Sequence, residues 1–369
     1  MSGAVHSDPV QLIQGYRSLP ILGGYLILAG ALAVNACRII YVRYCARLKQ
    51  NDWDRSHGHT QFLLFASLAG LSLGATWYYM FAFFAHSYHN WAASQPTVDL
   101  VDPQKGTLFK LELWLQNAKL FREAWETVIE TRARFWWSGQ IFLWTTGWSV
   151  FLGVMGDSDI QDSPRMGLHA FGPDRCHLLC AESVLRNNSC LSKATTCEGG
   201  SRMAKNVVRD PVVAWSPPVY LEAIPVAISL ISTVLVPSVA HTKYFMLLLL
   251  IPHLLLFVPA ILRPSRSWSR ESQAQAGTEE GVLRRYVTGF KWYTAACVAI
   301  QAHSTFLVLQ DNGLTMGAAS LASLARHLPS VIYEHPAVSS VSWDVIMCTA
   351  TAIAWIVVNG GEPRKMLGQ

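Results

Sequence analysis

Apolar residues in this chain gather into long runs that are separated by shorter polar segments. Most runs hold about twenty residues, the length that an α-helix needs to cross the hydrocarbon core of a bilayer. The pattern predicts an all-α integral membrane helix bundle with seven transmembrane helices. The runs lie at about Leu19–Val42, Gln61–His86, Phe135–Met155, Pro218–Ala240, Tyr244–Leu262, Tyr286–Leu309 and Ser340–Val358.

One further helix is predicted at 106–134, between the second and third runs, and it is amphipathic. Apolar residues such as Trp114, Phe121 and Trp125 recur there at helical spacing. Polar residues follow the other side of this helix, namely Glu112, Gln116, Lys119, Glu123, Glu126 and Glu130. Such a helix is expected to lie on the bilayer surface, and here it leads directly into the third run.

A polar insert divides the chain into membrane spans one to three at 1–156 and spans four to seven at 217–369. The insert, 157–216, lacks hydrophobic periodicity and contains Cys176, Cys180, Cys190 and Cys197. Four cysteines can hold zinc, but this spacing matches no common zinc-binding motif. We therefore expect no metal, and an insert that is disordered or poorly specified.

Basic residues predict the orientation of the spans. Of the 369 residues 51% are hydrophobic and 14% are charged, and the net charge is +5. Basic residues cluster after the first span, before the sixth and after the seventh, which places these loops in the cytoplasm and the N-terminus in the lumen. They form no single stripe, so no nucleic-acid partner is expected. The expected environment is a bilayer, that of the endoplasmic reticulum, and the sequence leaves the oligomeric state open.

Four acidic residues near or within the spans are candidates for acid catalysis. Glu123 and Glu126 lie on one face of the amphipathic helix, Asp344 opens the seventh span, and Glu222 lies one turn into the fourth. The two glutamates are most simply part of a solvated helix face, and Asp344 and Glu222 fit equally well as side chains that reach the membrane interface. We expect Glu123, Glu126 and Asp344 to meet on the lumenal side, with Glu222 at the opposite edge.

Aromatic side chains predict an apolar surface suited to a cationic intermediate. In the third span Trp137, Gln140, Trp144 and Trp148 share one helical face, with Gln140 most simply an interhelical hydrogen-bonding group. In the second span Trp77, Phe81 and Phe84 repeat at similar spacing. The simplest interpretation is that these aromatic side chains face lipid and that some of them form a belt at the membrane interface. Alternatively, the two faces enclose a cavity in which each ring stabilises a cation by roughly 0.5 to 2 kcal/mol.

The block that starts at Trp114 resembles a known family. Its WLQN-x-x-LF-x-EAW helix, followed by a WW-S-x-Q span, is similar to the fungal membrane-bound terpene cyclases of the ascofuranone and macrophorin type over about Leu113–Gly156. The resemblance implies a cyclase that folds the farnesyl chain of a meroterpenoid into rings without a cofactor. It also implies that a protonated carboxylic acid starts the reaction by protonating either an epoxide or a terminal alkene. Which of these two groups receives the proton stays open.

Two other functions fit seven apolar runs. A receptor or sensor is consistent with an outside N-terminus and a cytoplasmic C-terminus, although no extended ligand-binding ectodomain is apparent. A small-molecule transporter also fits the apolar runs, but the two halves of the chain show no internal repeat, which many transporters have.

Overall fold

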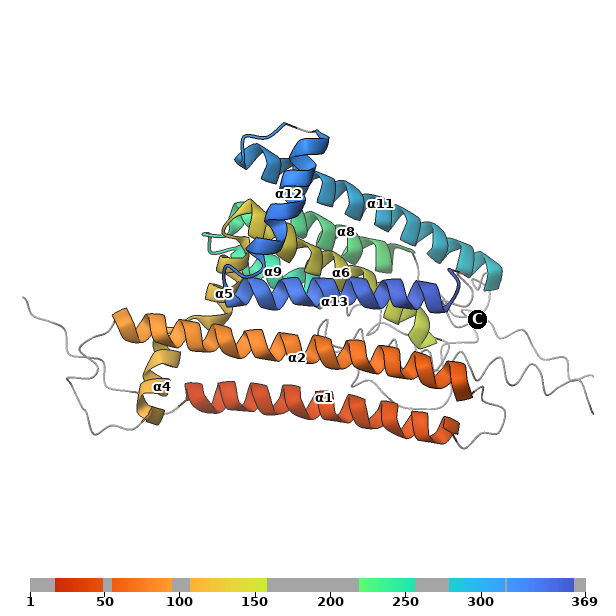
Figure 1. Ribbon diagram of the computed structural model, residues 1–369, viewed down its shortest axis with the longest axis horizontal. Coiled ribbons are helices and arrows are strands. Elements are labelled where there is room, and N and C mark those ends of the chain that lie inside the picture. Colours follow the sequence, from red (N-terminus) through yellow and green to blue (C-terminus); the bar gives the residue numbers. More distant parts are fainter. Residues whose placement is uncertain are drawn as a thin grey trace, which may run out of the picture.

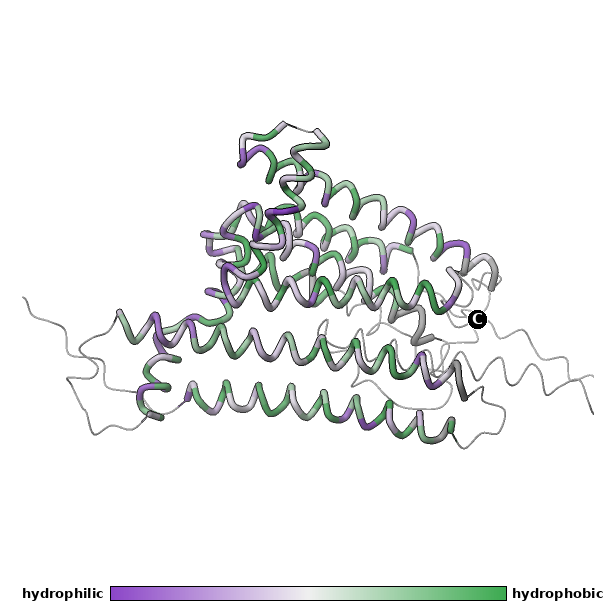
Figure 2. The backbone as a smooth tube through the Cα atoms, in the orientation of Figure 1, coloured by the Kyte–Doolittle hydropathy of each residue, from purple (hydrophilic) through white to green (hydrophobic). Residues whose placement is uncertain are grey.

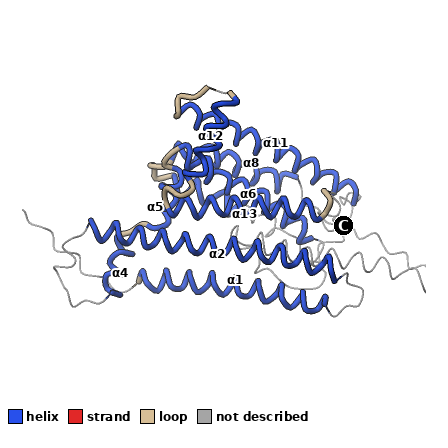
Figure 3. Tube along the Cα trace, viewed as in Figure 1, coloured by secondary structure: helices blue, strands red, loops and turns tan. Residues whose placement is uncertain are grey.

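The computed structural model describes residues 17–48, 55–94, 107–157, 219–255, 279–315 and 317–361. All regular secondary structure within these residues is helical (Figure 3), which confirms the prediction of an all-α protein for this part of the chain. The elements are α1 (Ser18–Leu48), α2 (Arg55–Ser94), α4 (Thr107–Asn117), α5 (Leu120–Ile129), α6 (Arg132–Asp157), α8 (Val219–Leu235), η2 (Val236–Val239), α9 (Phe245–Leu255), α11 (Glu279–Asp311), α12 (Ala318–Val331) and α13 (Pro336–Val358).

The long helices lie side by side, and the short helices α4, α5 and α12 gather at one end of them (Figure 1). Apolar residues dominate the long helices along most of their length (Figure 2). Five helices are long and apolar enough to cross a membrane, which indicates an integral membrane protein. These candidate spans are Ser18–Val42, Gly58–Ser94, Val219–Val239, Arg284–Asp311 and Pro336–Val358.

Two of the seven predicted spans are not among these five. The polar side chains and tryptophans of α6 lower its mean hydropathy, and only eleven residues of α9 are described. The count of seven therefore stays a prediction. The short helix α12, which carries Leu324 and Leu328 toward the end of α11, was not expected from the sequence.

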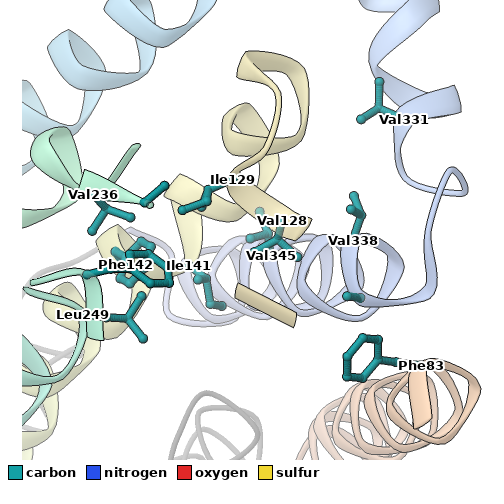
Figure 4. Close-up of a cluster of buried hydrophobic side chains, with 13 residues drawn as sticks. Phe83, Val128, Ile129, Ile141, Phe142, Val236, Leu249, Val331, Val338 and Val345 are labelled. Atoms are coloured by element: carbon teal, nitrogen blue, oxygen red, sulfur yellow. The ribbon is translucent and has the colours of Figure 1, made fainter. Parts of the chain in front are cut away.

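Helix α13 lies between α2 and α6 and packs against both. Its Trp355 contacts Phe65 of α2 with ring centroids 6.0 Å apart, while its Val338 and Val345 join α5 and α6 in the main core (Figure 4). Helix α13 thus occupies part of the space between α2 and α6, and aromatic residues of the three helices, Phe65, Trp148 and Trp355, meet in one cluster. The alternative of a cavity between the aromatic faces of α2 and α6 stays a prediction.

The main hydrophobic core joins the short helices to the long ones. It contains Val128 and Ile129 of α5, which lie against apolar side chains of α6, η2, α9 and α13 (Figure 4). The buried members are Phe83, Val128, Ile129, Ile141, Phe142, Val236, Ala240, Phe245, Leu249, Val331, Ala337, Val338 and Val345. Helix α5 is thereby fixed against the ends of the long helices by its apolar face.

The predicted amphipathic helix at 106–134 is three segments rather than one. The chain leaves helical geometry after Asn117 and again after Ile129, so α4, α5 and the start of α6 point in different directions. Each segment packs on a different partner: α4 on α1 and α2, and α5 on α6 and α13. One straight helix could not reach both surfaces, so tertiary packing overrides the continuous periodicity.

Glu112 of α4 holds the N-terminus of α1. Its side chain is fully buried, with 0% exposed, although the sequence placed it on a solvated face. It accepts backbone N–H groups of Arg17, Ser18 and Leu19 at 3.1, 2.9 and 2.8 Å. These are N–H groups that have no partner within an α-helix. Burial raises the pKa of Glu112, but the hydrogen bonds from Gln116 and from these backbone groups lower it further, and the net pKa is below the usual value.

Replacing Glu112 by leucine should release the start of α1. The substitution keeps an apolar contact but removes the acceptor of three partly exposed backbone N–H groups, and each net hydrogen bond contributes about 0.5–1.5 kcal/mol. We expect a lower unfolding temperature of the detergent-purified protein and faster proteolysis near Ser18. Gln116→Ala, which removes a single bond to Glu112, is the matched control and should change little.

Gly147 allows α6 and α11 to approach closely. A Cβ on Gly147 would lie 3.0 Å from Cε1 of Tyr293, whose hydroxyl donates to the backbone carbonyl of Leu143. The ring is fixed at both ends and has little freedom to move away. At the preceding residue, the hydroxyl of Thr146 lies 2.5 Å from that of Ser229 and joins α6 to α8.

Gly147→Ala should therefore destabilise the protein, by about 1–3 kcal/mol for an overpacked core position. Gly74→Ala is the matched control, because a Cβ there meets no atom within 4 Å and alanine favours the helix. Equal unfolding temperatures for the two variants would contradict the proposed close approach of Tyr293.

Candidate functional site in the membrane interior

Asp344 lies inside the candidate span of α13, two helical turns after Pro336. The sequence placed it at the opening of its span, but the helix begins earlier, because His335 and Pro336 form its N-terminal cap. Only 9% of Asp344 is exposed. A carboxyl group at this depth is expensive in a membrane and marks a candidate functional site.

The hydroxyl of Thr76 on α2 is the contact of Asp344 that defines the site. Thr76 Oγ1 is within hydrogen-bonding distance of Asp344 Oδ1, and it also lies 2.9 Å from the backbone oxygen of Ser72. A hydroxyl carries one hydrogen, so it cannot donate to both oxygens. A neutral Asp344 resolves this conflict, because its own O–H can donate to Thr76 while Thr76 donates to Ser72.

The surface between α2 and α13 contains small side chains around this acid. Ala69 and Ser72 of α2 and Cys348 of α13 are all buried. Small residues let two helices approach closely within a membrane. The Ser72 hydroxyl has no hydrogen-bond partner among the described residues, so an unpaired hydroxyl group lies one turn of α2 from Thr76.

The other three candidate acids accept hydrogen bonds from backbone N–H, hydroxyl or guanidinium groups. Glu123 accepts the backbone N–H of Lys119 at 2.8 Å and the hydroxyl of Ser87 at 3.3 Å. Glu126 pairs with Arg122 at 2.7 Å, one turn away on α5, and its side chain is 30% exposed. Glu123 therefore binds the backbone at the start of α5, and Glu126 forms an ion pair within the same helix.

Glu222 lies in the first turn of α8 and contacts the start of α11. Its carboxylate accepts from Arg285 at 3.1 Å and from the hydroxyl of Tyr286 at 2.8 Å. A guanidinium partner stabilises the anion, so Glu222 is suited to joining two helices rather than to donating a proton.

The structure does not bring the candidate acids together. Ser87, which binds Glu123, and Thr76, which contacts Asp344, are eleven residues apart on α2, or about 16 Å along the helix axis. The two acids thus lie at different depths of the bundle. Glu222 is at the other end of the long helices, as the sequence predicted.

The aromatic side chains of α2 extend along the helix from Thr76. Ring centroids of Trp77 and Phe81 are 5.7 Å apart, and those of Phe81 and Phe84 are 6.2 Å apart. The ring of Trp77 faces Gly30 of α1, and Phe81 is 46% exposed. Phe84 packs against the main core. Trp77 therefore lies toward α1, whereas Phe84 reaches the main core.

The tryptophan face of α6 points into the protein rather than toward lipid. Trp137 donates to the backbone oxygen of Leu328 at 3.0 Å and thereby holds α12. Trp144 packs against both the main core and a second aromatic cluster, and Trp148 lies within that second cluster. Gln140 donates to the backbone oxygen of Trp136 in its own helix at 2.9 Å.

Sequence reasoning missed a histidine pair at the end of the bundle where α13 starts. His335 Nδ1 accepts the backbone N–H of Ala337 at 3.2 Å, and its ring lies 4.7 Å from that of His86. Proline at 336, the first helical position, is the signal that could have identified His335 as the cap. Burial, and then the neighbouring His86 and Arg134, lower the pKa of His335 to about 4, although Glu130 raises it.

No group of three His, Cys, Asp or Glu side chains that could hold a metal occurs in the described part of the chain. The insert at 157–216, with Cys176, Cys180, Cys190 and Cys197, lies outside the described residues apart from Asp157. Its predicted disorder and lack of zinc stay predictions.

Comparison with known proteins adds no assignment. No protein-family model, curated protein or solved structure matches this chain.

Acidification should weaken the corner between α12 and α13. Because the pKa of His335 is about 4 in the folded protein and about 6.5 when unfolded, the unfolded chain binds more protons between these values. The contribution of neutral His335 to the free energy of unfolding is therefore complete above about pH 6.5, and it declines as the pH falls toward 4. Thermal unfolding should show less dependence on pH in this window for His335→Asn, which keeps a capping oxygen, than for wild type. Similar pH dependence in both proteins would contradict this assignment.

Proposed function

We propose that this protein is an integral membrane terpene cyclase, and that Asp344 is the acid that starts the reaction. The single observation that carries the proposal is a carboxyl group buried inside a candidate membrane span, in contact with a hydroxyl whose one hydrogen is shared between two oxygens. The resemblance of the tryptophan-rich block to meroterpenoid cyclases supports the same chemistry. The substrate would carry a farnesyl chain on an oxygen-bearing ring.

Apolar surroundings favour the protonated form of a carboxyl group, because the anion loses its hydration. A neutral Asp344 could therefore transfer its proton to a terminal epoxide oxygen or to a terminal alkene carbon. In the first case the carbon–oxygen bond breaks and the oxygen stays as a hydroxyl group. Alkene electron pairs then form the new carbon–carbon bonds, and a proton leaves at the last step. The product has the mass of the substrate, and Asp344 regains a proton.

Aromatic side chains near Asp344 would stabilise the migrating positive charge. Phe84 lies about two turns along α2 from Thr76 and packs against the main core, which also contains Val345, the residue after Asp344. Trp137 and Trp144 pack against the same core. Ring faces stabilise a cation by roughly 0.5 to 2 kcal/mol each, and more where water is excluded.

We infer seven spans with the N-terminus in the lumen, in the endoplasmic reticulum membrane. Helices α6 and α9 would add two spans to the five apolar ones, which gives the chain a consistent alternation in direction (Figure 1). Arg284 and Arg285 begin α11 at the end of the bundle where α1 and α13 finish. At the opposite end Arg122, Arg132 and Arg134 each pair with a carboxylate, so this end has little excess positive charge.

The test of the acid is Asp344→Asn in membranes that receive a farnesylated phenol or its terminal epoxide. The amide keeps the shape but has no proton of comparable acidity to transfer, so formation of a cyclised isomer should fall by roughly a hundredfold or more. Thr76→Val, which removes only the hydroxyl, should reduce the rate by about tenfold. Insertion of each variant is checked by protease protection.

The matched controls are Glu123→Gln, Glu126→Gln and Glu222→Gln, which should retain cyclisation in properly inserted protein. Full activity of Asp344→Asn would contradict the assignment of the acid. Specific binding or vesicle uptake of these compounds by wild type, without any isomer of unchanged mass, would favour the receptor or transporter alternative instead.

A further inference from the structure

Two buried indole N–H groups without an acceptor occur in the second aromatic cluster, near the end of α13. Trp148 and Trp355 are 7% and 3% exposed, and neither Nε1 has a hydrogen-bond partner among the described residues. A buried donor that is left unpaired costs about 1–3 kcal/mol. Tryptophans of an interfacial belt avoid this cost because they face lipid headgroups and water, but these two face the protein.

Both indoles border the same pair of phenyl rings. Phe151 lies 5.1 Å from Trp148 and 6.5 Å from Trp355 between ring centroids, and Phe65 lies 6.0 Å from Trp355. The four rings come from α2, α6 and α13, the same helices that surround Asp344. A cluster of ring faces with two N–H donors is suited to a flat ring that carries oxygen atoms.

Trp136 donates to Thr305 Oγ1 at 2.9 Å, and Trp137 donates to the backbone oxygen of Leu328 at 3.0 Å, so two tryptophans of α6 have acceptors within the protein. Trp91 and Trp343 share with Trp148 and Trp355 a buried indole N–H that has no partner among the described residues. Trp148 and Trp355 differ because one aromatic cluster holds both of them, so two unpaired donors lie beside the same ring of Phe151. This pairing points to an acceptor from a ligand.

The position of the cluster relative to Asp344 suits an amphipathic substrate. Eleven residues of α13 separate Asp344 from Trp355, or about 16 Å along the helix. Trp355 is one turn from the end of α13 at Val358, whereas Asp344 is deeper. A prenylated ring dissolved in a bilayer keeps its polar ring near the interface and its chain in the interior. A ring at the second cluster would therefore direct its chain toward the acid.

We propose that Trp148 and Trp355 form the subsite for the oxygen-bearing ring of the substrate. Their N–H groups donate to oxygen atoms on the ring, and Phe65 and Phe151 pack against its faces. The subsite binds the part of the substrate that does not react and holds the farnesyl chain toward Asp344. This inference rests on the proposed function, but it concerns binding and is tested without turnover.

The test compares two probes on purified protein in nanodiscs by equilibrium binding. One probe is a farnesyl-substituted resorcinol, and the other is farnesylbenzene, which lacks both ring oxygens. Wild type should prefer the resorcinol, and the double variant Trp148→Phe/Trp355→Phe should lose about tenfold or more of that preference. The ratio of the two affinities cancels any loss of packing that both probes share. An unchanged ratio would overturn the proposal.

Trp136→Phe with Trp137→Phe is the matched control, because those indoles already have acceptors in the protein. It should lower the unfolding temperature and leave the preference unchanged. Asp344→Asn separates the subsite from the proposed reaction, because it should retain the preference while cyclisation is lost. If the control variant reduces the preference as much as the double variant does, the subsite is wrongly assigned even if cyclisation occurs.

Lipid ester carbonyls offer the same acceptor chemistry as the ring oxygens, so the measurement is repeated in nanodiscs of diester and of diether phosphatidylcholine. A preference that is the same in both lipids supports the ring subsite. A preference that the variants lose only in diester lipid would overturn it in favour of a lipid-binding site.

Discussion

The burial of Asp344 between α2 and α13 is the constraint on which the arrangement of the central helices depends. A charged carboxylate at this depth would lack hydration, so the carboxyl group needs a hydrogen-bonding neighbour and exclusion from lipid. Thr76 provides the neighbour, and the small residues Ala69 and Ser72 let α2 approach closely enough. Helix α13 also packs against α6 and thereby lies between α2 and α6.

Most other acidic residues of the described chain act in helix capping and pairing. Glu112 holds the start of α1, Glu123 binds the start of α5, and Glu222 joins α8 to α11. Their partners are backbone N–H groups or guanidinium groups, which favour the anion. Asp344 differs in its position, because it is buried inside a candidate membrane span, where it contacts the hydroxyl of Thr76. Burial at this depth therefore marks it as the candidate proton donor.

The all-α class and the long apolar helices could be predicted from the sequence, because run length in a membrane protein is set by bilayer thickness. The periodicity of 106–134 showed which residues are apolar, but not the turns after Asn117 and Ile129 that seat α4 and α5 on different partners. Glu112 looked like a solvated residue because its acceptor role depends on α1, more than ninety residues earlier. Asp344 was identified, but its depth and its contact with Thr76 depend on the register of two helices, which no local pattern encodes.

The central claim is that Asp344 is a protonated acid in the resting protein. Infrared difference spectroscopy of reconstituted protein near neutral pH measures this directly, because the C=O stretch of a protonated carboxyl group is separate from the bands of a carboxylate. We predict that the spectrum of wild type minus Asp344→Asn contains the band of a protonated carboxyl group, and that this band shifts in Thr76→Val as its hydrogen bond is lost. A difference spectrum that contains only carboxylate bands would contradict the account.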